Sequence, residues 1–277
     1  MKAPIFLFGS GRCGSTLMQR AINAHPEVVM YGEHEGFLGP VANSYHKLTQ
    51  TKDVERFVFG DDAVSPDLIH GPIKDSNVDI CWVNNFTRED VYREHRNLVL
   101  NLLTRGLDLD EVHWGFKEIR YRKGQHTLWF LREMFPNCQF VILLRDPLDT
   151  IVSGFLAWEN PAALLQEENR VMTMASNRID GWNEKYGYLM NYARKNPDGL
   201  LVVKYEELVR DPAHWMQQIF SLLDLETPQL ALDMFSHRVA STTDDPQRTE
   251  LVSIVSEALR QTGNEEFKAL AGELGYV

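Results

Sequence analysis

Residues suited to binding an anion gather near the start of the chain, within residues 9–16. Gly9 and Gly14 have the spacing of the phosphate-binding loop G-x-x-x-x-G-K-[ST], and four apolar residues precede them. Glycine lets the backbone turn tightly, so its N–H groups and the start of the next helix form a concave donor surface. Ser15 replaces the lysine of the motif, and Arg12 lies inside the turn. The guanidinium of Arg12 can bind phosphate oxygens in bidentate fashion, so the loop is still suited to an anion. Because the lysine that neutralises a triphosphate is missing, the loop favours an anion other than a nucleoside triphosphate.

A second candidate anion site follows the apolar run 140–144. Asp146 suits a helix N-cap and Pro147 suits the first helical position, so a helix is expected to begin here. Arg145 then lies at the carboxyl end of a strand, where open α/β sheets bind ligands. Ser153 is two turns along the predicted helix. The pattern alone equally allows an Arg145 that only pairs with local carboxylates and a Ser153 on the surface.

The elements that must position these residues alternate along the chain. Strands, mostly continuous apolar runs, are expected at 5–8, 28–31, 114–116, 140–144 and 200–203. Helices are expected from residue 16 and at 88–103, 125–135, 148–158, 171–193 and 213–223. This alternation predicts an α/β fold: a doubly wound, mainly parallel sheet with helices on both faces. Residues 36–79 show no sustained period and are expected to form long loops with short helices, which often determine specificity.

Composition sets the class of protein. The chain has 277 residues, of which 44% are hydrophobic and 24% charged, as in ordinary globular proteins. A net charge of −11 argues against nucleic acid as a partner and is compatible with a cationic small molecule. No segment resembles a signal peptide or a membrane span, and the three cysteines show no disulfide or zinc pattern. We therefore expect a cytoplasmic protein with no membrane partner.

The two anion sites together resemble those of the sulfotransferases that use 3′-phosphoadenosine 5′-phosphosulfate (PAPS). In that family the first loop binds the 5′-phosphosulfate and the R-D-P segment, with a serine eight residues on, binds the 3′-phosphate. The matching positions are Gly11, Arg12, Cys13, Gly14, Ser15, Thr16, Arg145 and Ser153, with Tyr205 in a segment that lies near the adenine. The resemblance implies a P-loop NTPase-like fold in a single domain, 1–277, with 35–112 and 159–198 shaping the acceptor pocket. Residues 241–243 and Arg248 loosely resemble a late cofactor-covering loop.

The segment after Thr16 is similar to the bacterial and tyrosylprotein-type branch of these enzymes. In that branch a glutamate after the second strand is the catalytic base, and ungapped counting from Arg12 places it at Glu33, with His34 and Glu35 as alternates. The resemblance also implies that Lys117 stabilises charge on the leaving group. From the residues alone, a solvated Glu-His-Glu loop and a surface lysine paired with Glu118 remain alternatives.

The resemblance implies transfer of a sulfuryl group from PAPS to a hydroxyl or amine, and the compact chain favours a small, natural-product-like acceptor. The transfer is in line, leaves 3′-phosphoadenosine 5′-phosphate (PAP) and requires no metal. A P-loop nucleotide kinase or adenylylsulfate kinase is one alternative, disfavoured by the missing lysine at Ser15 and by the lack of a clear Mg²⁺-binding acid. A non-catalytic nucleotide-binding protein is the other.

Overall fold

The structure is a computed structural model that describes residues 1–51, 86–236 and 245–276. The chain divides into two compact units. Unit 1 comprises Met1–Gly36, Asp108–Lys123 and Asn137–Val277, and unit 2 comprises Phe37–Leu107 and Gly124–Pro136. The expectation of a single domain over 1–277, with an acceptor pocket shaped by 35–112 and 159–198, stays a prediction.

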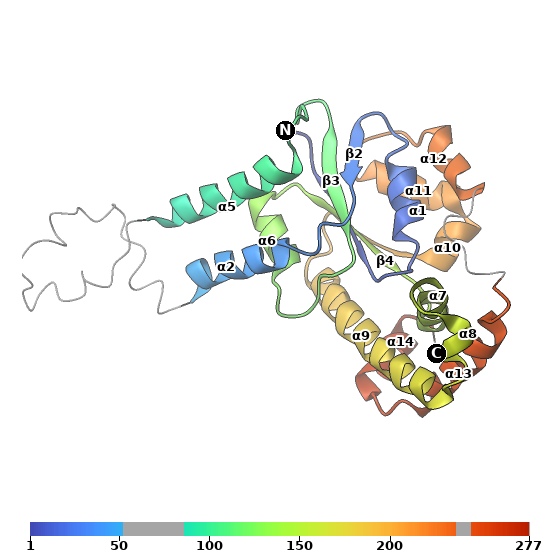
Figure 1. Ribbon diagram of the computed structural model, residues 1–277. Helices are drawn as coiled ribbons and strands as arrows, with labels where there is room; N and C mark the ends of the chain where they lie inside the picture. The colour runs from blue at the N-terminus through green and yellow to red at the C-terminus, as the bar shows by residue number, and fades with distance from the viewer. Residues whose placement is uncertain (52–85, 237–244, 277) are drawn as a thin grey trace, which may run out of the picture. The chain divides into compact units, whose positions relative to one another are not determined.

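Unit 1 is built on a five-stranded sheet with the order β2-β3-β1-β4-β5, in which every pair is parallel (Figure 1). Its strands are β1 (Ile5–Gly9), β2 (Val28–Tyr31), β3 (His113–Glu118), β4 (Gln139–Leu144) and β5 (Leu200–Lys204). All five predicted strands are confirmed, and so is the doubly wound parallel sheet. The central strand is β1. The chain first adds β2 and β3 on one side of β1 and then adds β4 and β5 on its other side, so the direction of winding reverses at β1.

Helices cover both faces of the sheet in two groups. One group contains α1 (Ser15–Ile22), α10 (Tyr205–Arg210), α11 (Pro212–Ser221), α12 (Gln229–Asp233) and a 3₁₀ turn, Met234–Ser236. The other contains α7 (Pro147–Trp158), α8 (Pro161–Leu164), α9 (Glu168–Lys195), α13 (Arg248–Gln261) and α14 (Glu265–Glu273). The helices predicted in this unit are confirmed within a few residues. The short helices α8, α10 and α12 and the last two helices, α13 and α14, were not predicted.

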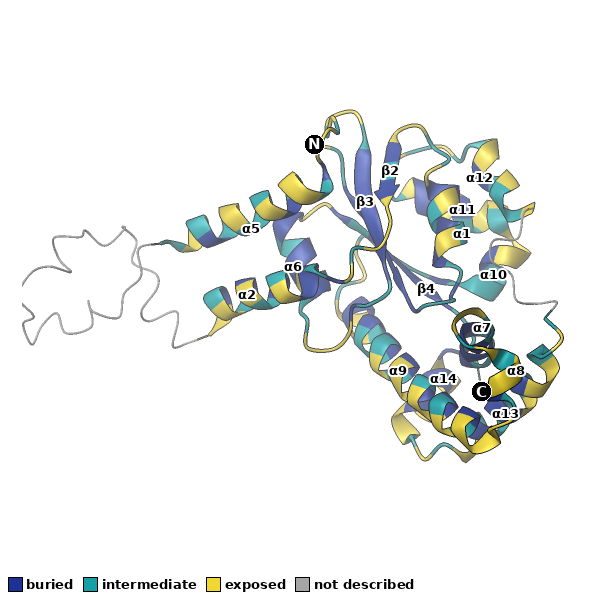
Figure 2. Ribbon diagram, in the orientation of Figure 1, coloured by how far each residue is buried: buried dark blue, intermediate teal, exposed yellow. Residues whose placement is uncertain are grey.

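Alternation along β1 explains why the sheet has two buried faces. Ile5 and Leu7 pack into the core beneath the α1 group, whereas Phe6 and Phe8 point to the opposite face, because successive strand residues alternate. On that opposite face Phe6 and Phe8 both contact the ring of Phe140. The central strands β1 and β3 are accordingly buried along their whole length and β4 along nearly all of it, whereas the edge strands β2 and β5 are partly exposed and the helices expose their outer stripes (Figure 2).

The described part of unit 2 contains the helices α2 (Leu38–Gln50), α5 (Arg88–Leu103) and α6 (Thr127–Met134). Thr87 caps α5 in a capping box with Asp90, which fixes where that helix begins. The α5 prediction is confirmed. The prediction of loops and short helices from residue 36 is wrong for residues 38–50, which form a 13-residue helix, and its remainder lies largely outside the described residues.

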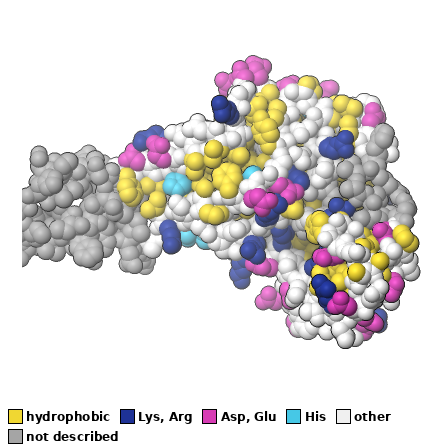
Figure 3. All heavy atoms as spheres, in the orientation of Figure 1, with side chains coloured by type: hydrophobic (Ala, Val, Ile, Leu, Met, Phe, Trp, Pro, Cys, Tyr) yellow, Lys and Arg dark blue, Asp and Glu magenta, His cyan; other side chains and the backbone are white. Residues whose placement is uncertain are grey.

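Acidic and basic side chains intermingle on the face drawn in Figure 3. Within residues 1–51, 86–236 and 245–276, no helix is long and apolar enough to cross a membrane.

Candidate active site

The residues singled out from the sequence meet at one edge of the sheet in unit 1, at the carboxyl ends of its strands. The anion loop follows β1, and Glu33 follows β2. Lys117 is the penultimate residue of β3, Arg145 follows β4 and Tyr205 follows β5. Parallel strands end together, so five segments that are far apart in sequence supply one site, at the position where open α/β sheets bind ligands.

The anion loop turns through two left-handed residues, Arg12 with φ 66° and Gly14 with φ 94°. Gly14 is the N-cap of α1. A Cβ on Gly14 would lie 2.3 Å from the ring of Tyr205, so the ring packs directly on the loop. After the turn, Ser15 is buried and Thr16 is exposed at the start of the helix, where the first N–H groups have no intrahelical partner.

Arg12 and Arg145 join the two predicted phosphate sites. The Arg12 Nε–H donates to Ser153 Oγ at 3.1 Å, and Ser153 is buried rather than on the surface. Arg145 Nη1 donates to the backbone oxygen of Arg12 at 2.9 Å. The carbonyl of Arg145 accepts a hydrogen bond from the indole N–H of Trp182 at 3.2 Å. The loop after β1 and the start of α7 therefore form one connected surface, which the sequence placed in two separate motifs.

This surface carries positive charge that is incompletely neutralised. Burial and the neighbouring Arg145 both lower the pKa of Arg12 from its ordinary value, which means that its cation is disfavoured here. The Arg145 guanidinium lies 4.6 Å from the ring centre of Tyr205 and 3.5 Å from Asp149. Its Nε is buried without a hydrogen-bond partner among the described residues. Asp149 also pairs with Arg248, so one carboxylate is shared by two guanidinium groups. Pairing with local carboxylates alone therefore does not account for the contacts of Arg145. Residues 241–243 lie outside the described residues.

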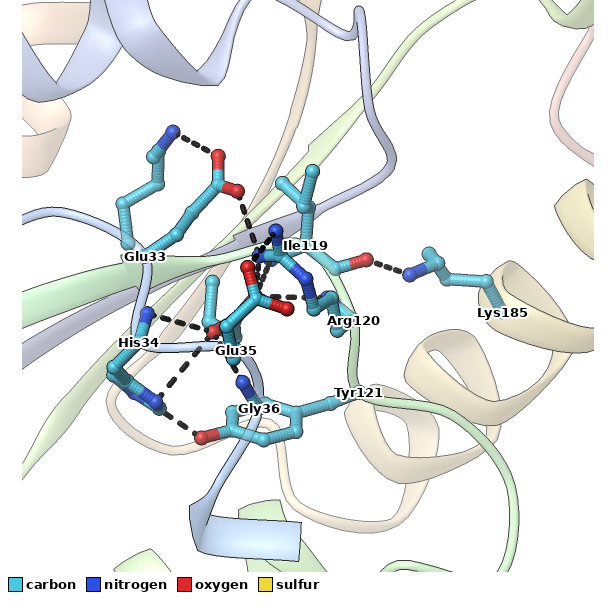
Figure 4. A network of polar contacts seen from close by, with 10 residues as sticks. Glu33, His34, Glu35, Gly36, Ile119, Arg120, Tyr121 and Lys185 are labelled. Carbon is cyan, nitrogen blue, oxygen red and sulfur yellow. Dashed lines mark hydrogen bonds and ion pairs between the residues drawn. The ribbon is translucent and has the colours of Figure 1, made fainter.

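Glu33 and Lys117 form a second polar cluster at the same edge of the sheet. Lys117 Nζ donates to Glu33 Oε1 at 2.5 Å, and Arg120 Nη1 donates to Glu33 Oε2 at 2.7 Å (Figure 4). Lys117 is only 5% exposed, so the alternative of a surface lysine paired with Glu118 is wrong. The solvated-loop alternative fits Glu35, whose side chain is 85% exposed, but not Glu33, which is held between two cations.

Charge and burial set the protonation of this cluster. Burial alone would raise the pKa of Glu33, but the hydrogen bonds from Lys117 and Arg120 outweigh burial and lower its pKa below the ordinary 4.5. Glu33 is therefore a carboxylate at neutral pH. Burial lowers the pKa of His34 below 6.5, although the charge of Glu118 opposes this. His34 Nε2 lies 3.2 Å from the hydroxyl of Tyr121, so the ring faces that tyrosine and Glu118.

Glu118 is the functional residue that sequence reasoning missed. It is 1% exposed, and its two oxygens accept from four backbone N–H groups, those of His34, Gly36, Ile119 and Arg120, at 2.8–3.1 Å. Nη1 of Arg120 adds a fifth bond at 3.0 Å. Glu118 therefore fastens the loop that carries Glu33 to the end of β3. Its place directly after Lys117 at a strand end was the only available signal.

The change Glu118→Gln is expected to lower the free energy of unfolding by about 1–3 kcal/mol, because an amide nitrogen would then face backbone donors in a buried place. Burial would raise the pKa of Glu118, but these hydrogen bonds hold it below 4.5. Its folded pKa thus lies below its unfolded pKa, so the stabilisation is present above pH 4.5 and disappears as the pH falls through the folded value. Urea unfolding of the wild type and of Glu118→Gln at pH 7 and pH 4 measures the difference between their free energies of unfolding. That difference should be smaller at pH 4, and an equal difference at both pH values would contradict the prediction.

Cys13 fills space beneath the anion loop. It is fully buried, and burial raises the pKa of its thiol, so it is not a reactive thiolate at neutral pH. Nearby, Lys185 of α9 donates to the backbone oxygen of Ile119, and burial lowers the pKa of Lys185 to about 8.

Within the described ranges, no cluster of three or more His, Cys, Asp or Glu side chains is suited to hold a metal ion.

Comparison with known proteins identifies the family. The profile of the sulfotransferase family matches residues 4–229. A Caenorhabditis briggsae protein assigned as a protein-tyrosine sulfotransferase is 23% identical over 234 residues, which are 82% of this chain and 68% of that protein.

Two solved structures share the fold. The sulfotransferase domain of the Synechococcus PCC 7002 olefin synthase aligns with a TM-score of 0.51 and 19% identity, covering 100% of this chain and 97% of that one. The sulfotransferase domain from the curacin biosynthetic pathway aligns with a TM-score of 0.55 and 16% identity, covering 100% and 99%. Because the family profile spans well over half of its 277 residues, the chain belongs to the sulfotransferase family.

Proposed function

We propose that the protein transfers a sulfuryl group from PAPS to a hydroxyl or amine of a small-molecule acceptor, with Glu33 as the base. The observation that carries this proposal is the contact of Glu33 with the buried Lys117, at the sheet edge that also presents Arg12 and Arg145. A base, a cation for the leaving oxygen and an anion site thus occur together. These are the groups that an in-line transfer of an anionic group to a neutral nucleophile needs.

The anion surface fits a donor that has phosphate groups at two positions. Arg145, with its unpartnered Nε, and the buried hydroxyl of Ser153 would hold the 3′-phosphate. The backbone around Gly14 and the start of α1 would hold the 5′-phosphosulfate, with Arg12 between the two sites. An added anion would relieve the unfavourable proximity of Arg12 and Arg145, which already lowers the pKa of Arg12.

Tyr205 is suited to contact the adenine. Its ring packs on Gly14 and lies under the guanidinium of Arg145, so it borders both phosphate sites. The tyrosine also packs against the apolar core of unit 1, which holds its ring in place. This position is compatible with the place near the adenine that the family resemblance implies.

In the transfer, the bond between sulfur and the bridging oxygen of PAPS breaks as a bond from sulfur to the acceptor oxygen or nitrogen forms. Glu33 takes the proton of the acceptor, and PAP leaves with the electron pair of the broken bond. Lys117 stabilises the charge on that oxygen. When Lys117 turns from Glu33 to the leaving group, Glu33 loses one of the two hydrogen bonds that lower its pKa, and so becomes a stronger base.

The direct test measures binding and turnover separately. PAP at about 100 times its Kd should stabilise the fold by about 2.7 kcal/mol, which thermal unfolding detects. PAPS should then sulfonate members of a library of phenols, aliphatic alcohols and amines, with each product identified by its mass. Transfer should persist in excess EDTA, because the expected mechanism needs no metal. Absence of stabilisation by PAP, or Mg²⁺-dependent ATP hydrolysis, would contradict the proposal and favour a nucleotide kinase.

A further inference from the structure

Tyr276 lies after α14, far along the chain from both phosphate motifs. Helix α14 packs against α9 and ends at Gly275, whose φ of 72° is left-handed (Figure 1). The N–H of Tyr276 then donates to the backbone oxygen of Ala271 at 2.8 Å, and that of Gly275 donates to Gly272 at 3.0 Å. This pair of hydrogen bonds is the Schellman arrangement, which turns the chain out of a helix at a fixed point. The position of Tyr276 is therefore determined by a defined helix end.

The side chain of Tyr276 contacts two residues that come from different elements of unit 1. Its hydroxyl donates to Oε2 of Glu206 in α10 at 3.2 Å. Its ring lies edge-to-face on Trp182 of α9, with 6.2 Å between the two ring centres. Burial raises the pKa of Tyr276, and the charge of Glu206 raises it further. The hydroxyl therefore keeps its proton at neutral pH and remains a hydrogen-bond donor to Glu206.

These two partners of Tyr276 hold one peptide group at both of its polar ends. The indole N–H of Trp182 donates to the carbonyl oxygen of Arg145 at 3.2 Å. Oε1 of Glu206 accepts from the N–H of Asp146 at 2.9 Å. This carbonyl and this N–H belong to the same planar unit, the one that joins Arg145 to Asp146, and in a trans unit they point in opposite directions. The plane of the unit is therefore fixed from both sides, which sets ψ of Arg145 and φ of Asp146.

The Arg145–Asp146 peptide group connects the two side chains assigned to the 3′-phosphate. Arg145 precedes it. Asp146, which follows it, is the N-cap of α7 and accepts from the N–H of Leu148 at 2.7 Å, and α7 carries the buried Ser153. A rotation of this peptide group would move the Arg145 guanidinium relative to the Ser153 hydroxyl. Because a guanidinium binds phosphate as a planar fork, its hydrogen bonds depend on that geometry.

The hydroxyl of Tyr276 also counteracts a repulsion between carboxylates. Burial raises the pKa of Asp146, and the charges of Asp149 and Glu206 raise it further, against the hydrogen bond from the N–H of Leu148. Glu206 is therefore repelled by Asp146 although it must stay beside the N–H of that residue. A donor on the other oxygen of Glu206 offsets this repulsion, since hydrogen bonds to an ionised carboxylate are strong. Without the hydroxyl, Glu206 would hold the peptide group less firmly.

We propose that Tyr276 is a positioning residue for the 3′-phosphate of the donor, because through Glu206 and Trp182 it fixes the Arg145–Asp146 peptide group. This inference rests on the proposed use of PAPS and adds a residue from outside both phosphate motifs. Tyr276 acts through Arg145. It should therefore affect the binding of nucleotides that carry a 3′-phosphate and not of those that lack one.

The test variant is Tyr276→Phe, which keeps the ring on Trp182 and removes only the hydroxyl that binds Glu206. Calorimetric titration should show that this variant binds PAP about 3–10-fold more weakly than the wild type, in the range that the loss of one hydrogen bond produces. The affinity for adenosine 5′-phosphate, which lacks the 3′-phosphate, should change by less than about twofold. An unchanged affinity for PAP, or an equal loss for both nucleotides, overturns the proposal.

A double variant shows whether Tyr276 acts through Arg145. In the Arg145→Ala background, Tyr276→Phe should cause little further loss of PAP affinity, since the residue through which it acts is absent. An equal loss in the two backgrounds would contradict the positioning role. A merely structural contribution of Tyr276 would lower the free energy of unfolding and would leave this coupling at zero.

The matched control is Tyr31→Phe, which removes a hydroxyl from β2, at the opposite edge of the sheet from β5. It should leave the affinities for both nucleotides unchanged. If the wild type binds PAP no more tightly than adenosine 5′-phosphate, the donor assignment fails, and this inference fails with it. If the wild type prefers PAP and Tyr276→Phe keeps the full preference, the positioning role fails and the donor assignment stands.

Discussion

Glu33→Gln is expected to lower the turnover number by about 10²–10⁴-fold, the usual contribution of a general base. Glutamine keeps an oxygen that accepts hydrogen bonds from Lys117 and Arg120, which hold this side chain at 2.5 and 2.7 Å, so the local structure should persist. It cannot accept the acceptor's proton. PAP should bind no more weakly than to the wild type, because Glu33 lies beside the cation and not in the anion loop. Initial rates with PAPS, together with calorimetric titration of PAP, measure both quantities.

The matched controls are His34→Gln and Glu35→Gln, which alter the two neighbours without removing the Glu33 carboxylate. The pH profile gives a further check. Because the pKa of Glu33 in the free protein is lowered below 4.5, the base is ionised throughout the neutral range, and kcat/KM, which reports the free enzyme, should decline only as the pH falls below that value. Full turnover of Glu33→Gln with a large loss in either control would transfer the role of the base to that residue.

Arg145→Ala is expected to weaken PAP binding by roughly 100-fold, or about 2.7 kcal/mol, because one or two charge-assisted hydrogen bonds to the 3′-phosphate are lost. The ligand itself supplies the control. Adenosine 5′-phosphate lacks the 3′-phosphate, so its affinity should change only slightly. Calorimetric titration of the two nucleotides into both proteins completes the comparison.

Arg12→Ala provides the contrasting variant. Arg12 lies inside the anion loop and also donates to Ser153 at 3.1 Å, so its loss should weaken both nucleotides. Arg145→Lys should recover only part of the PAP affinity, because an ammonium replaces a bidentate fork by a single point charge. If Arg145→Ala weakened PAP and adenosine 5′-phosphate equally, Arg145 would not be the 3′-phosphate residue.

The sequence determined the sheet well because its signals are local. The central strands β1 and β4 are short apolar runs, almost entirely buried in a parallel sheet, and Asp146 with Pro147 marks the start of α7 as expected. Helix α13 was missed, although Leu251, Ile254, Val255 and Ala258 form its buried stripe at helical spacing. The error at α2 has another origin. Its glycine, proline and asparagine weaken the helical pattern, but tertiary packing in unit 2 overrides their low propensity.

The site was only partly predictable, because contacts between distant segments decide it. Glu33 and Lys117 were each found, but 84 residues separate them, and nothing local shows that they touch. Glu118 carries no motif, and its role follows only from the backbone N–H groups that the folded loop brings to it. Tyr276 belongs to no motif either. Its hydrogen bond to Glu206 exists only because the chain after α14 returns to the end of β5.

The left-handed backbone of Arg12 has a consequence for how this protein can change. An L-residue other than glycine at φ 66° costs roughly 1–2 kcal/mol of folding free energy, a considerable part of the stability of a typical domain. A glycine would adopt the same conformation without that cost, but would lack the guanidinium. Selection for a more stable chain and selection for anion binding therefore act in opposite directions at this single position.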